Sequence, residues 1–337
     1  MLRVRPVAVA DHAALYKLAQ QAGVGFTSLP ADKHAIQRKI AMSLASFNGD
    51  AQQAYFLLVI EDMIKKRVVG CSAIDAKVGG AWPFYAYKLS TKMQVSQTLT
   101  INQPIQILTL NNDYQDCTEL CSLFLAQNYR HSFNARLLSY ARLLLIAQFP
   151  ALFSEKVIVE LRGVSDEAGN SPFWESVGRH FFFMDFATAD RLTMTQGKQF
   201  IVDLVPHHPI YVSMLTLAAQ AAIGQPHKDT IAAKILLERQ GFTFGNYVDI
   251  FDAGPLMEVA RQKIKIIKHY LQVELAEITE LDNSATELYL ISNTQLHMLA
   301  TVAPLYFRND SQICITPQTA DILQVTLGAP LGIAPLN

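Results

Sequence analysis

The stretch Ser171-Pro-Phe-Trp174, continued by Gly178-Arg-His-Phe-Phe-Phe-Met-Asp185, combines aromatic bulk, turn residues and charge more densely than core packing alone usually requires. Pro172 fits the first turn of a short helix that Ser171 can cap, and Gly178 is placed to end that helix. The apolar run from Phe181 to Met184 then predicts a buried strand. Packing is the simplest role for its three consecutive phenylalanines.

The composition is that of a folded and nearly neutral protein. Half of the 337 residues are hydrophobic, 17% are charged, and the net charge is −1. A chain of this length usually exceeds one core, so we expect two domains. It offers no basic field for nucleic acid and no apolar run of about 18 residues for a membrane span. The first residues resemble a strand rather than an export signal, so we expect a cytoplasmic protein.

Apolar periodicity predicts the secondary structure of the first half of the chain. Strands are expected over 2–6, 54–60, 68–74 and 119–125, and helices over 9–19, 31–47 and 136–149. A polar and aromatic insertion follows the third strand and extends to about residue 101. Strands and helices in this order indicate an α+β fold.

The second half of the chain predicts two regions that differ in the length and type of their secondary-structure elements. Up to Gly254-Pro255 we expect a strand over 198–205, helices over 210–222 and 230–240, and a strand over 242–251. Beyond about residue 262 the segments are short: strands over 264–270, 275–278, 287–291, 299–302 and 313–315, a helix over 316–323, and a closing hairpin-like pair over 325–333. We therefore predict a catalytic domain over 1–256 and a small, mostly-β, barrel-like domain over 257–337, which supports the first domain or contacts another subunit.

Seven short segments occur in one order along the chain: Gly25-Phe-Thr-Ser-Leu-Pro30, Glu119-Leu-Cys-Ser-Leu-Phe-Leu125, Glu160-Leu-Arg-Gly163, the stretch from Ser171 to Asp185, His208-Pro-Ile-Tyr211, Gly224-Gln-Pro-His227 and Asp249-Ile-Phe-Asp-Ala-Gly-Pro255. Together they resemble the arginine N-succinyltransferase family of acyl-CoA N-acyltransferases. That family transfers succinyl from succinyl-CoA to the α-amine of arginine in arginine catabolism. The resemblance implies an N-acyltransferase-like mixed sheet flanked by helices, with succinyl-CoA as co-substrate and no permanently bound cofactor.

The cofactor site is expected where the strand over 119–125 leads into a helix. In acyl-CoA-dependent N-acyltransferases this turn has the form Arg/Gln-x-x-Gly-x-Gly/Ala, and its N–H groups and the helix N-terminus receive the CoA pyrophosphate. Here it is Arg130-His-Ser-Phe-Asn-Ala135. Phe133 replaces the glycine, and a side chain there is expected to crowd the phosphates. By the resemblance, the contacts to CoA come from Leu123, Leu125, Arg130, Asn134, Ala135 and Arg136.

Taken without the resemblance, several of these residues have simpler roles. A loop of this kind more often only joins a strand to a helix, and Leu123 is then a core residue of its strand. With the resemblance, Leu123 contacts succinyl-CoA through backbone groups, where the pantetheine arm adds to the strand as another strand would.

His227 is the candidate for proton transfer. Acyl transfer to an amine needs a neutral amine, a stabilised oxyanion and a proton for the departing thiolate, but no covalent enzyme intermediate. A histidine titrates near neutral pH, and His227 lies in a loop before a predicted helix. An ordinary loop histidine is the alternative. The resemblance implies that the histidine of this motif is the catalytic proton donor.

Charged residues are the candidates for substrate recognition. A planar guanidinium is bound by carboxylates, for which Glu160, Asp249 and Asp252 are candidates, and the carboxylates of arginine and succinate are bound by cations, for which Arg162 and Arg179 are candidates. Each of them could equally be a solvated surface charge. The neighbouring His207 and His208 lack the third ligand of a metal centre, and the four cysteines lack zinc-site spacing, so we predict no metal.

Three functions stay open at this point. The first is arginine N-succinyltransferase, as a homo- or hetero-oligomer. The second is a related N-acyltransferase with another donor or acceptor such as ornithine. The third is a non-catalytic CoA-binding subunit, which Phe133 favours and His227 disfavours.

Overall fold

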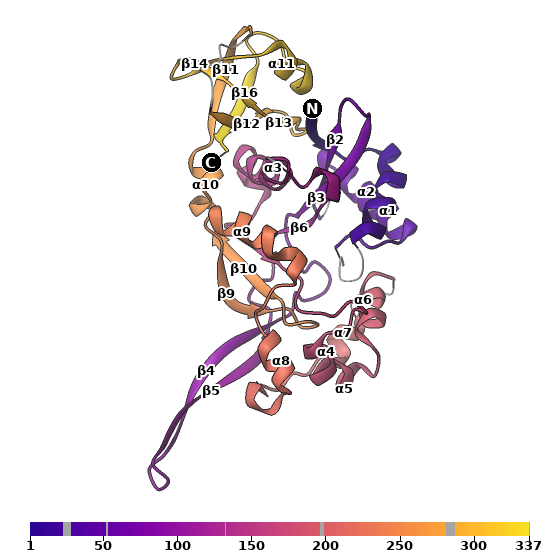
Figure 1. Cartoon of the computed structure of the whole chain (residues 1–337), viewed down its shortest axis with the longest axis vertical. Helices are drawn as coiled ribbons and strands as arrows, with labels where there is room; N and C mark the ends of the chain where they lie inside the picture. The colour runs from indigo at the N-terminus through magenta and orange to yellow at the C-terminus, as the bar shows by residue number, and fades with distance from the viewer. Residues whose placement is uncertain (23–27, 52, 132, 196–198, 281–286, 337) are drawn as a thin grey trace.

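The computed structural model of the chain describes residues 1–22, 28–51, 53–131, 133–195, 199–280 and 287–336. Its described strands form one long mixed sheet flanked by helices (Figure 1). The strands follow the spatial order β14-β15-β11-β16-β12-β13-β1-β2-β3-β6-β7-β10-β9-β4-β5-β8. Two neighbouring pairs are parallel, β6 with β7 and β11 with β15, and the other pairs are antiparallel. The predicted mixed sheet with flanking helices is therefore confirmed.

The strand bounds place the sheet in the sequence. They are β1 (Leu2–Pro6), β2 (Tyr55–Asp62), β3 (Arg67–Asp75), β4 (Ala86–Ser96), β5 (Ile101–Asn111), β6 (Thr118–Leu125), β7 (Lys156–Glu160), β8 (Ile210–Tyr211), β9 (Thr243–Val248), β10 (Pro255–Ala260), β11 (Leu271–Ile278), β12 (Leu288–Asn293), β13 (Ala300–Pro304), β14 (Tyr306–Asn309), β15 (Gln312–Ile315) and β16 (Pro330–Pro335).

Helices cover both faces of the central strands. The α-helices are α1 (His12–Ala22), α2 (Lys33–Phe47), α3 (Asn134–Gln148), α4 (Pro172–Ser176), α5 (Gly178–Phe182), α6 (Phe186–Thr195), α7 (Gln199–Leu204), α8 (Leu217–Ala222), α9 (Ile231–Arg239), α10 (Lys265–Lys268) and α11 (Pro317–Leu323). Helix α3 packs its apolar residues into one core, whereas α1 and α2 pack against the other face of β2 and β3. None of the described helices is long and apolar enough to cross a membrane.

The aromatic stretch after Ser171 forms two short helices around a separate core. Ser171 caps α4 as predicted, because its Oγ accepts the N–H of Trp174 at 3.3 Å. The predicted strand from Phe181 to Met184 is wrong, since α5 begins at Gly178 and ends at Phe182. The ring centroids of Phe182 and Trp174 lie 5.1 Å apart with the rings tilted, whereas Phe181 and Phe183 are exposed. A run of three phenylalanines carries no periodicity, so contacts distant in sequence decide its conformation.

Three other predicted segments differ from the structure. The predicted strand over 198–205 is helix α7 over the residues that are described, the predicted helix over 210–222 begins only at Leu217 after the short β8, and the predicted strand over 264–270 contains α10. These are short amphipathic segments whose pattern fits either state. Each packs beside a larger element, and that packing selects its conformation.

The predicted insertion after β3 is a long two-stranded ribbon, β4 with β5, that extends away from the body (Figure 1). It pairs along its whole length from Ala86↔Asn111 to Ser96↔Ile101. Only its base joins the sheet, through Tyr87 and Lys88 on β9 and through Ile107 and Leu108 on β8.

The C-terminal strands do not close into the predicted barrel. Among the described residues, β14 forms one outer edge of the sheet, and β13 continues the order into β1 through the pair Val4↔Ala300. Thr301 also donates its hydroxyl to the carbonyl of Leu2 at 2.9 Å. Short alternating strands predict a β-rich region, but closure depends on pairing partners that the pattern does not contain.

Candidate active site

The site begins where two parallel strands part. Strands β6 and β7 pair only at Thr118↔Val157 and Glu119↔Ile158. Beyond these pairs β6 stays with β3, while β7 stays with β10 up to Glu160↔Leu256. Among the described residues, no strand pairs with β6 after Glu119 on the side of β7, and an extended amide-bearing ligand can add at such an edge.

A bulge shapes this part of β6. Ser122 has φ of 53° and interrupts the register with β3. Its N–H donates to Ser28 Oγ at 3.0 Å and its own hydroxyl donates to the carbonyl of Ser28 at 3.2 Å. Tyr55 adds a third contact through its hydroxyl, 3.2 Å from Ser122 Oγ. Bulges redirect the following residue, here the partly exposed Leu123.

The predicted phosphate loop leads from β6 to the N-terminus of α3. Arg130 is exposed and donates from Nε to the carbonyl of Leu125 at 2.7 Å. Asn134 is buried and donates from its side chain to the carbonyl of Tyr129 at 3.1 Å. Ala135 and the partly exposed Arg136 lie in the first turn of α3. Phe133 is the N-cap residue, and its side chain forms no capping hydrogen bond. The loop presents two cations and the positive end of a long helix.

The expectation that Phe133 would crowd an approaching phosphate has no support in its geometry. Phe133 has φ of −93°, a conformation that needs no glycine, and its ring packs against the core beneath α3. Ser132 of the motif lies outside the described residues. A side chain that turns inward leaves the outer surface of the turn to the backbone.

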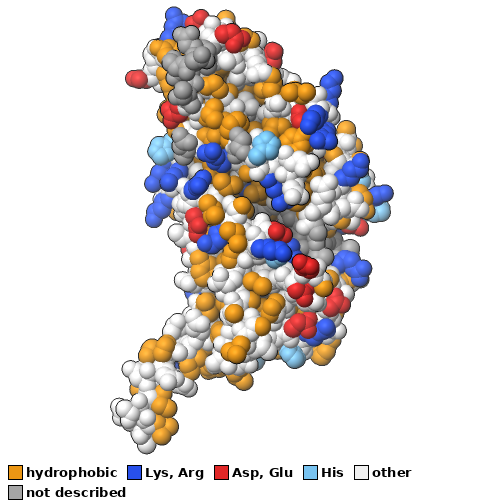
Figure 2. Space-filling model, in the orientation of Figure 1, with side chains coloured by type: hydrophobic (Ala, Val, Ile, Leu, Met, Phe, Trp, Pro, Cys, Tyr) orange, Lys and Arg blue, Asp and Glu red, His pale blue; other side chains and the backbone are white. Residues whose placement is uncertain are grey.

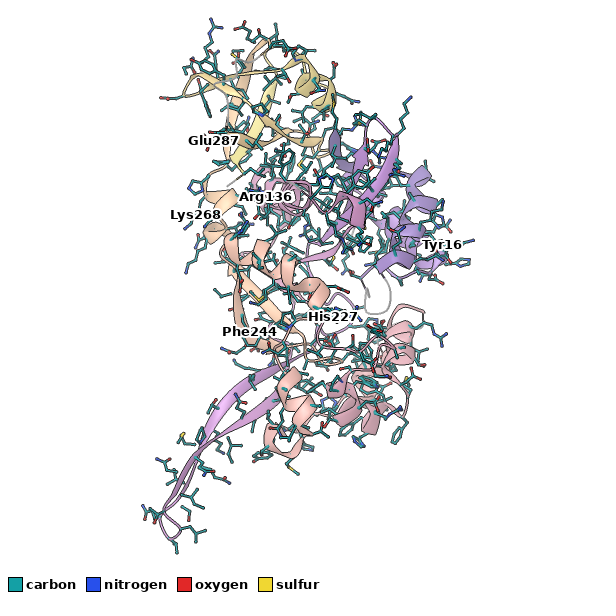
Figure 3. All side chains as sticks on the ribbon, in the orientation of Figure 1. Tyr16, Arg136, His227, Phe244, Lys268 and Glu287 are labelled. Atoms are coloured by element: carbon teal, nitrogen blue, oxygen red, sulfur yellow. The ribbon has the colours of Figure 1, made fainter. Side chains whose placement is uncertain are left out.

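The His227 loop is fixed to the chain that follows β7. The N–H of His227 donates to the carbonyl of Arg162 at 2.7 Å, and Gly163 forms a bridge with Pro226. Thr230 closes the turn, because its N–H donates to the carbonyl of His227 at 2.9 Å. The imidazole is 7% exposed. Figure 3 shows His227 in the middle of the molecule, with Arg136 on α3 above it.

The protonation of His227 follows from its surroundings. Its Nδ1 accepts the N–H of Asp229 at 3.2 Å, so the neutral ring carries its proton on Nε2. Burial, and then the charge of Arg162, lower the pKa of His227, whereas the Asp229 carboxylate 3.5 Å away raises it. The net direction is downward, so the ring is neutral near pH 7, with its proton on Nε2 and its Nδ1 lone pair engaged by the N–H of Asp229.

Two acidic candidates gather beside this loop. Glu160 ends β7 and Asp249 follows β9. Burial, and then the charge of Asp249, raise the pKa of Glu160 well above its usual range. Asp249 Oδ1 accepts the N–H groups of Phe251 and Asp252 at 2.7 and 2.8 Å. A cation placed beside Glu160 would offset the repulsion from Asp249 and favour ionisation of Glu160.

Asp252 occupies a structural position among the acidic candidates. Its two carboxylate oxygens accept the N–H groups of Gly163 at 2.7 Å and Gly254 at 2.8 Å. A Cβ on Gly254 would lie 2.1 Å from the carbonyl oxygen of Leu161, so this crossing accepts only glycine. The carboxylate therefore joins the chain after β7, which carries Glu160, to the chain before β10.

The two arginine candidates differ. Arg162 is half-buried beside His227; its Nη2 donates to Ser165 Oγ at 2.7 Å, and its buried Nε has no partner among the described residues. Burial lowers the pKa of Arg162, which still remains a cation. Arg179 lies on the surface of α5, paired with Glu175 at 2.6 Å. No described contact joins Arg179 to His227, Glu160 or Arg162.

Sequence reasoning missed the residues that support the site. Ser28 belongs to a recognised segment, but its bond to Ser122 links residues 94 positions apart and has no local signature. Residues 23–27 of the same segment lie outside the described residues. Asp229, two residues after His227, was identifiable as a nearby charge, because a carboxylate so close in sequence can reach the ring.

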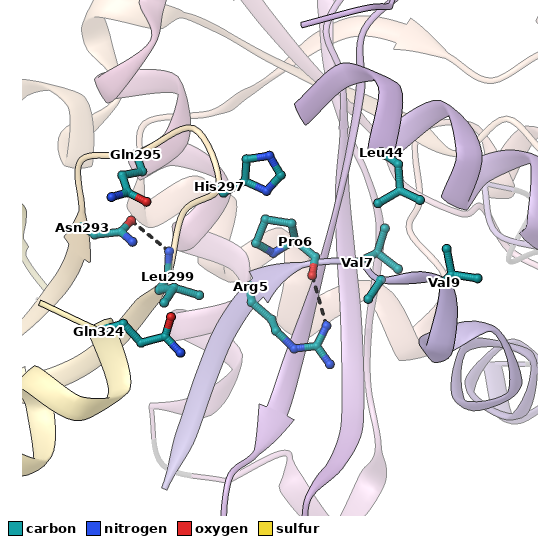
Figure 4. A pocket seen from close by; sticks show the side chains of 11 residues that line it. Arg5, Pro6, Val7, Val9, Leu44, Asn293, Gln295, His297, Leu299 and Gln324 are labelled. Carbon is teal, nitrogen blue, oxygen red and sulfur yellow. Dashed lines mark hydrogen bonds between the residues drawn. The ribbon is translucent and has the colours of Figure 1, made fainter. Parts of the chain in front are cut away.

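A cavity elsewhere contains none of these residues. It has a volume of about 520 Å³ and lies between β1, α2 and the C-terminal strands (Figure 4). Its lining includes Arg5, Leu44, Asn293, His297 and Gln324. Arg5 is already paired with Asp11 at 2.7 Å. We place the chemistry at His227, where a titratable group, strand ends and paired charges converge. The described residues hold no group of three or more His, Cys, Asp or Glu side chains suited to a metal ion.

Comparisons with known proteins agree along the whole chain. Residues 2–266 match the family described as arginine N-succinyltransferase beta subunit, and residues 271–335 match the C-terminal domain of the same subunit. The arginine N-succinyltransferase of Yersinia pestis (strain Pestoides F) is 39% identical over all of this chain and 98% of its own length. The arginine N-succinyltransferase subunit beta of Pseudomonas aeruginosa is 42% identical over 99% of this chain and 98% of its length.

A solved structure has the same fold. Arginine/ornithine succinyltransferase subunit AI from Pseudomonas aeruginosa superposes with a TM-score of 0.90 at 34% sequence identity. The match covers 100% of this chain and 99% of that chain.

Proposed function

Because the chain belongs to the arginine N-succinyltransferase family of acyltransferases, we propose that it transfers succinyl from succinyl-CoA to the α-amine of L-arginine by direct attack. The observation that carries the proposal is the position of His227, tied to the end of β7 at the point where β6 and β7 separate. A basic group and an unpaired strand edge at one place suit acyl transfer without a covalent intermediate.

The donor is assigned to the separation of β6 and β7. The amides of its pantetheine arm pair with the free edge of β6 near Leu123, as a short strand would. Its pyrophosphate reaches the first turn of α3, where backbone N–H groups, Arg130 and Arg136 provide positive charge. This arrangement supports an N-acyltransferase-like architecture for the catalytic half of the sheet.

His227 carries the proton between acceptor and leaving group. The α-amine of arginine must lose a proton before or during attack. The neutral ring accepts this proton on Nδ1, in place of the 3.2 Å bond from the N–H of Asp229, and becomes an imidazolium. The imidazolium is a stronger acid than usual because burial and then the charge of Arg162 lower the pKa of His227. It then returns the proton to the CoA thiolate as the thioester C–S bond breaks.

The acceptor is held by opposite charges. Glu160 and Asp249 bind the guanidinium, whose positive charge favours ionisation of Glu160. The unpartnered Nε of Arg162 binds a carboxylate, either that of arginine or that of the succinyl group. Asp252 is a positioning residue, because its oxygens already accept backbone N–H groups.

L-Ornithine is the second candidate acceptor. The solved Pseudomonas aeruginosa structure is named for both arginine and ornithine. A carboxylate pair accommodates an ammonium as well as a guanidinium, although it loses the bidentate geometry that guanidinium offers.

A substrate matrix tests the proposal. The purified chain is incubated with succinyl-CoA or acetyl-CoA, each with L-arginine or L-ornithine, and thiol release is followed. Release with succinyl-CoA and L-arginine is the expected result, and faster release with L-ornithine would assign the second acceptor. Tight CoA binding without release in any combination would contradict an enzymatic role and indicate a CoA-binding subunit.

A further inference from the structure

Arg142 is a buried cation that the catalytic proposal does not use. Lys and Arg side chains usually lie at the surface, as Figure 2 shows for one face of the molecule, and water solvates them there. Arg142 belongs to α3 and is only 1% exposed. Burial lowers the pKa of Arg142 to about 10, so its guanidinium is still protonated near pH 7. The chain therefore keeps a positive charge in its interior.

Neutral oxygens, rather than a carboxylate, surround the charge of Arg142. Its Nε donates to the carbonyl of Ser139 and its Nη2 to Ser139 Oγ, both at 3.1 Å, while Nη1 donates to the carbonyl of Cys121 at 3.3 Å. In the part of the chain that the structure describes, no Asp or Glu forms an ion pair with Arg142. A buried charge without a counter-ion is costly, and folded chains accept such costs mainly at functional sites.

The bond from Arg142 to Cys121 reaches the bulge of β6. One peptide unit joins Cys121 to Ser122, the residue with φ of 53°. The C=O of this unit accepts from Arg142, and its N–H donates to Ser28 Oγ at 3.0 Å. Because both ends of the peptide unit are bonded, its orientation is fixed, and so is the direction in which Leu123 leaves the bulge.

Arg142 also links the two elements assigned to the donor. Helix α3, which carries Arg142, is assigned the pyrophosphate at its N-terminus, and β6 is assigned the pantetheine arm near Leu123. Leu123 follows Cys121 by two residues, which is about 7 Å along a strand. A charge held in a buried place of low dielectric acts on a nearby oxygen more strongly than a surface charge does. The thioester carbonyl is the group that would lie within this field.

We propose that Arg142 is a positioning residue for the donor, which holds the bulge of β6 in the orientation that receives the thioester and polarises the thioester carbonyl with its charge. This inference rests on the proposed function, because it takes the donor to lie along β6 near Leu123. Arg142 acts through the peptide unit between Cys121 and Ser122, whose dipole it aligns. As the amine attacks, the carbonyl oxygen becomes an oxyanion, and a fixed positive charge stabilises the oxyanion more than the neutral thioester.

Three variants at one position separate the charge from the packing. Arg142→Met removes the charge and keeps an unbranched side chain, Arg142→Gln removes the charge and keeps an N–H donor, and Arg142→Lys keeps the charge. With succinyl-CoA and L-arginine, kcat should fall about 10- to 100-fold in the two neutral variants, less than for loss of a direct oxyanion donor, and recover at least in part in Arg142→Lys. KM for succinyl-CoA should change less than about twofold, because the effect belongs to the transition state.

Ser72→Ala is the matched control. The Ser72 hydroxyl donates to the carbonyl of Leu138 at 3.2 Å, so it also joins a strand to α3 by a buried bond, but it carries no charge. This variant should keep kcat near the wild-type value. Circular dichroism establishes that each variant is folded. Should Arg142→Met fail to fold, Arg142→Gln and Arg142→Lys provide the same comparison of neutral with charged side chains.

Infrared difference spectra measure the polarisation itself. Succinyl-CoA with an isotopic label at the thioester carbonyl is bound to each protein without an acceptor, so no turnover is needed. The carbonyl band should lie at a lower frequency on the wild-type chain than in water. It should move back toward the frequency in water in Arg142→Met and Arg142→Gln, but not in Ser72→Ala, and Arg142→Lys should keep most of the shift.

The two readouts separate this proposal from the proposed function. A wild-type band at the frequency found in water overturns the role of Arg142 even if the chain turns over. Equal kcat in Arg142→Gln and Arg142→Lys also overturns it, and so do equal losses in Arg142→Gln and Ser72→Ala, which would make Arg142 a structural residue only. A chain that binds succinyl-CoA without releasing thiol overturns the proposed function alone, because a shifted band still supports the effect of Arg142.

Discussion

The His227 loop and the turn before α3 are the two halves of the candidate site, and they are built differently. The His227 loop is bound to Arg162 and Gly163 through backbone groups and is buried. The turn before α3 presents the exposed Arg130 and an uncapped helix end. Proton transfer depends on distances within a fraction of an ångström, whereas a flexible diphosphate is attracted from any direction. Substitutions around His227 should therefore lower activity more than substitutions in the turn before α3.

His227→Ala should have the largest effect on activity. Loss of the proton carrier should lower kcat by about 10² to 10⁴, the usual contribution of a general acid or base. Thiol release with succinyl-CoA and L-arginine measures it, and the dissociation constant for CoA should stay unchanged. Turnover near the wild-type value would move the proton transfer to another group.

Gly254→Ala tests the rigidity of the His227 half. The added Cβ would meet the Leu161 carbonyl at 2.1 Å, so the crossing that Asp252 ties must open. We expect a loss of about 1 to 3 kcal/mol in unfolding free energy and a large loss of kcat. Gly49→Ala is the control, because open space surrounds Gly49 and only its φ of 81° is strained. An equal effect of both changes in thermal unfolding would remove the argument for a rigid crossing.

Glu160→Gln tests substrate binding on the rigid half. The amide cannot ionise against a guanidinium, so KM for L-arginine should rise roughly 10- to 100-fold, the range expected for a hydrogen bond to a charged group. Initial rates at varied L-arginine measure the change. Glu258→Gln is the control, since Glu258 bonds Tyr114 and Lys156 instead. Unchanged KM for L-arginine in the first variant would place the guanidinium elsewhere.

Arg136→Gln tests the tolerant half. One exposed ion pair with the diphosphate contributes about 0.2 to 1 kcal/mol, so KM for succinyl-CoA should rise only about twofold to fivefold, and less at high salt. The kcat value should not change. A loss of kcat as large as that of His227→Ala would erase the distinction between the two halves.

The smallest expected effects are shifts in the pH dependence of kcat. The lowered pKa keeps His227 neutral, so activity should fall only on the acidic side, below the ordinary histidine value of about 6.5. Asp229 raises this pKa and Lys228 lowers it, so Asp229→Asn should move the acidic limb of kcat to lower pH and Lys228→Gln to higher pH. Shifts in the same direction would show that the limb does not report His227.

The sequence predicted local elements better than the packing around them. The Ser171 cap, the strands of the central sheet and the position of His227 before a helix follow from local patterns, and they are confirmed as structure. The strand predicted over Phe181 to Met184 was wrong because a run of similar residues has no periodicity that distinguishes strand from helix. The structural use of Asp252 and the bond from Ser28 to Ser122 could not be predicted, since both join segments far apart in the chain. The substrate roles of Glu160, Arg162 and Arg179 stay predictions.

The parting of β6 and β7 after only two paired positions has a mechanical consequence. Only those two pairs join β6 to β7 directly. The His227 loop is attached to the chain after β7, and the bulge lies on β6. A thioester that pairs with the bulged β6 and reaches His227 would connect β6 to the segment that follows β7. The enzyme is then stiffest when loaded with donor, and the amine meets its finished pocket only after that loading, which favours an ordered sequence of binding.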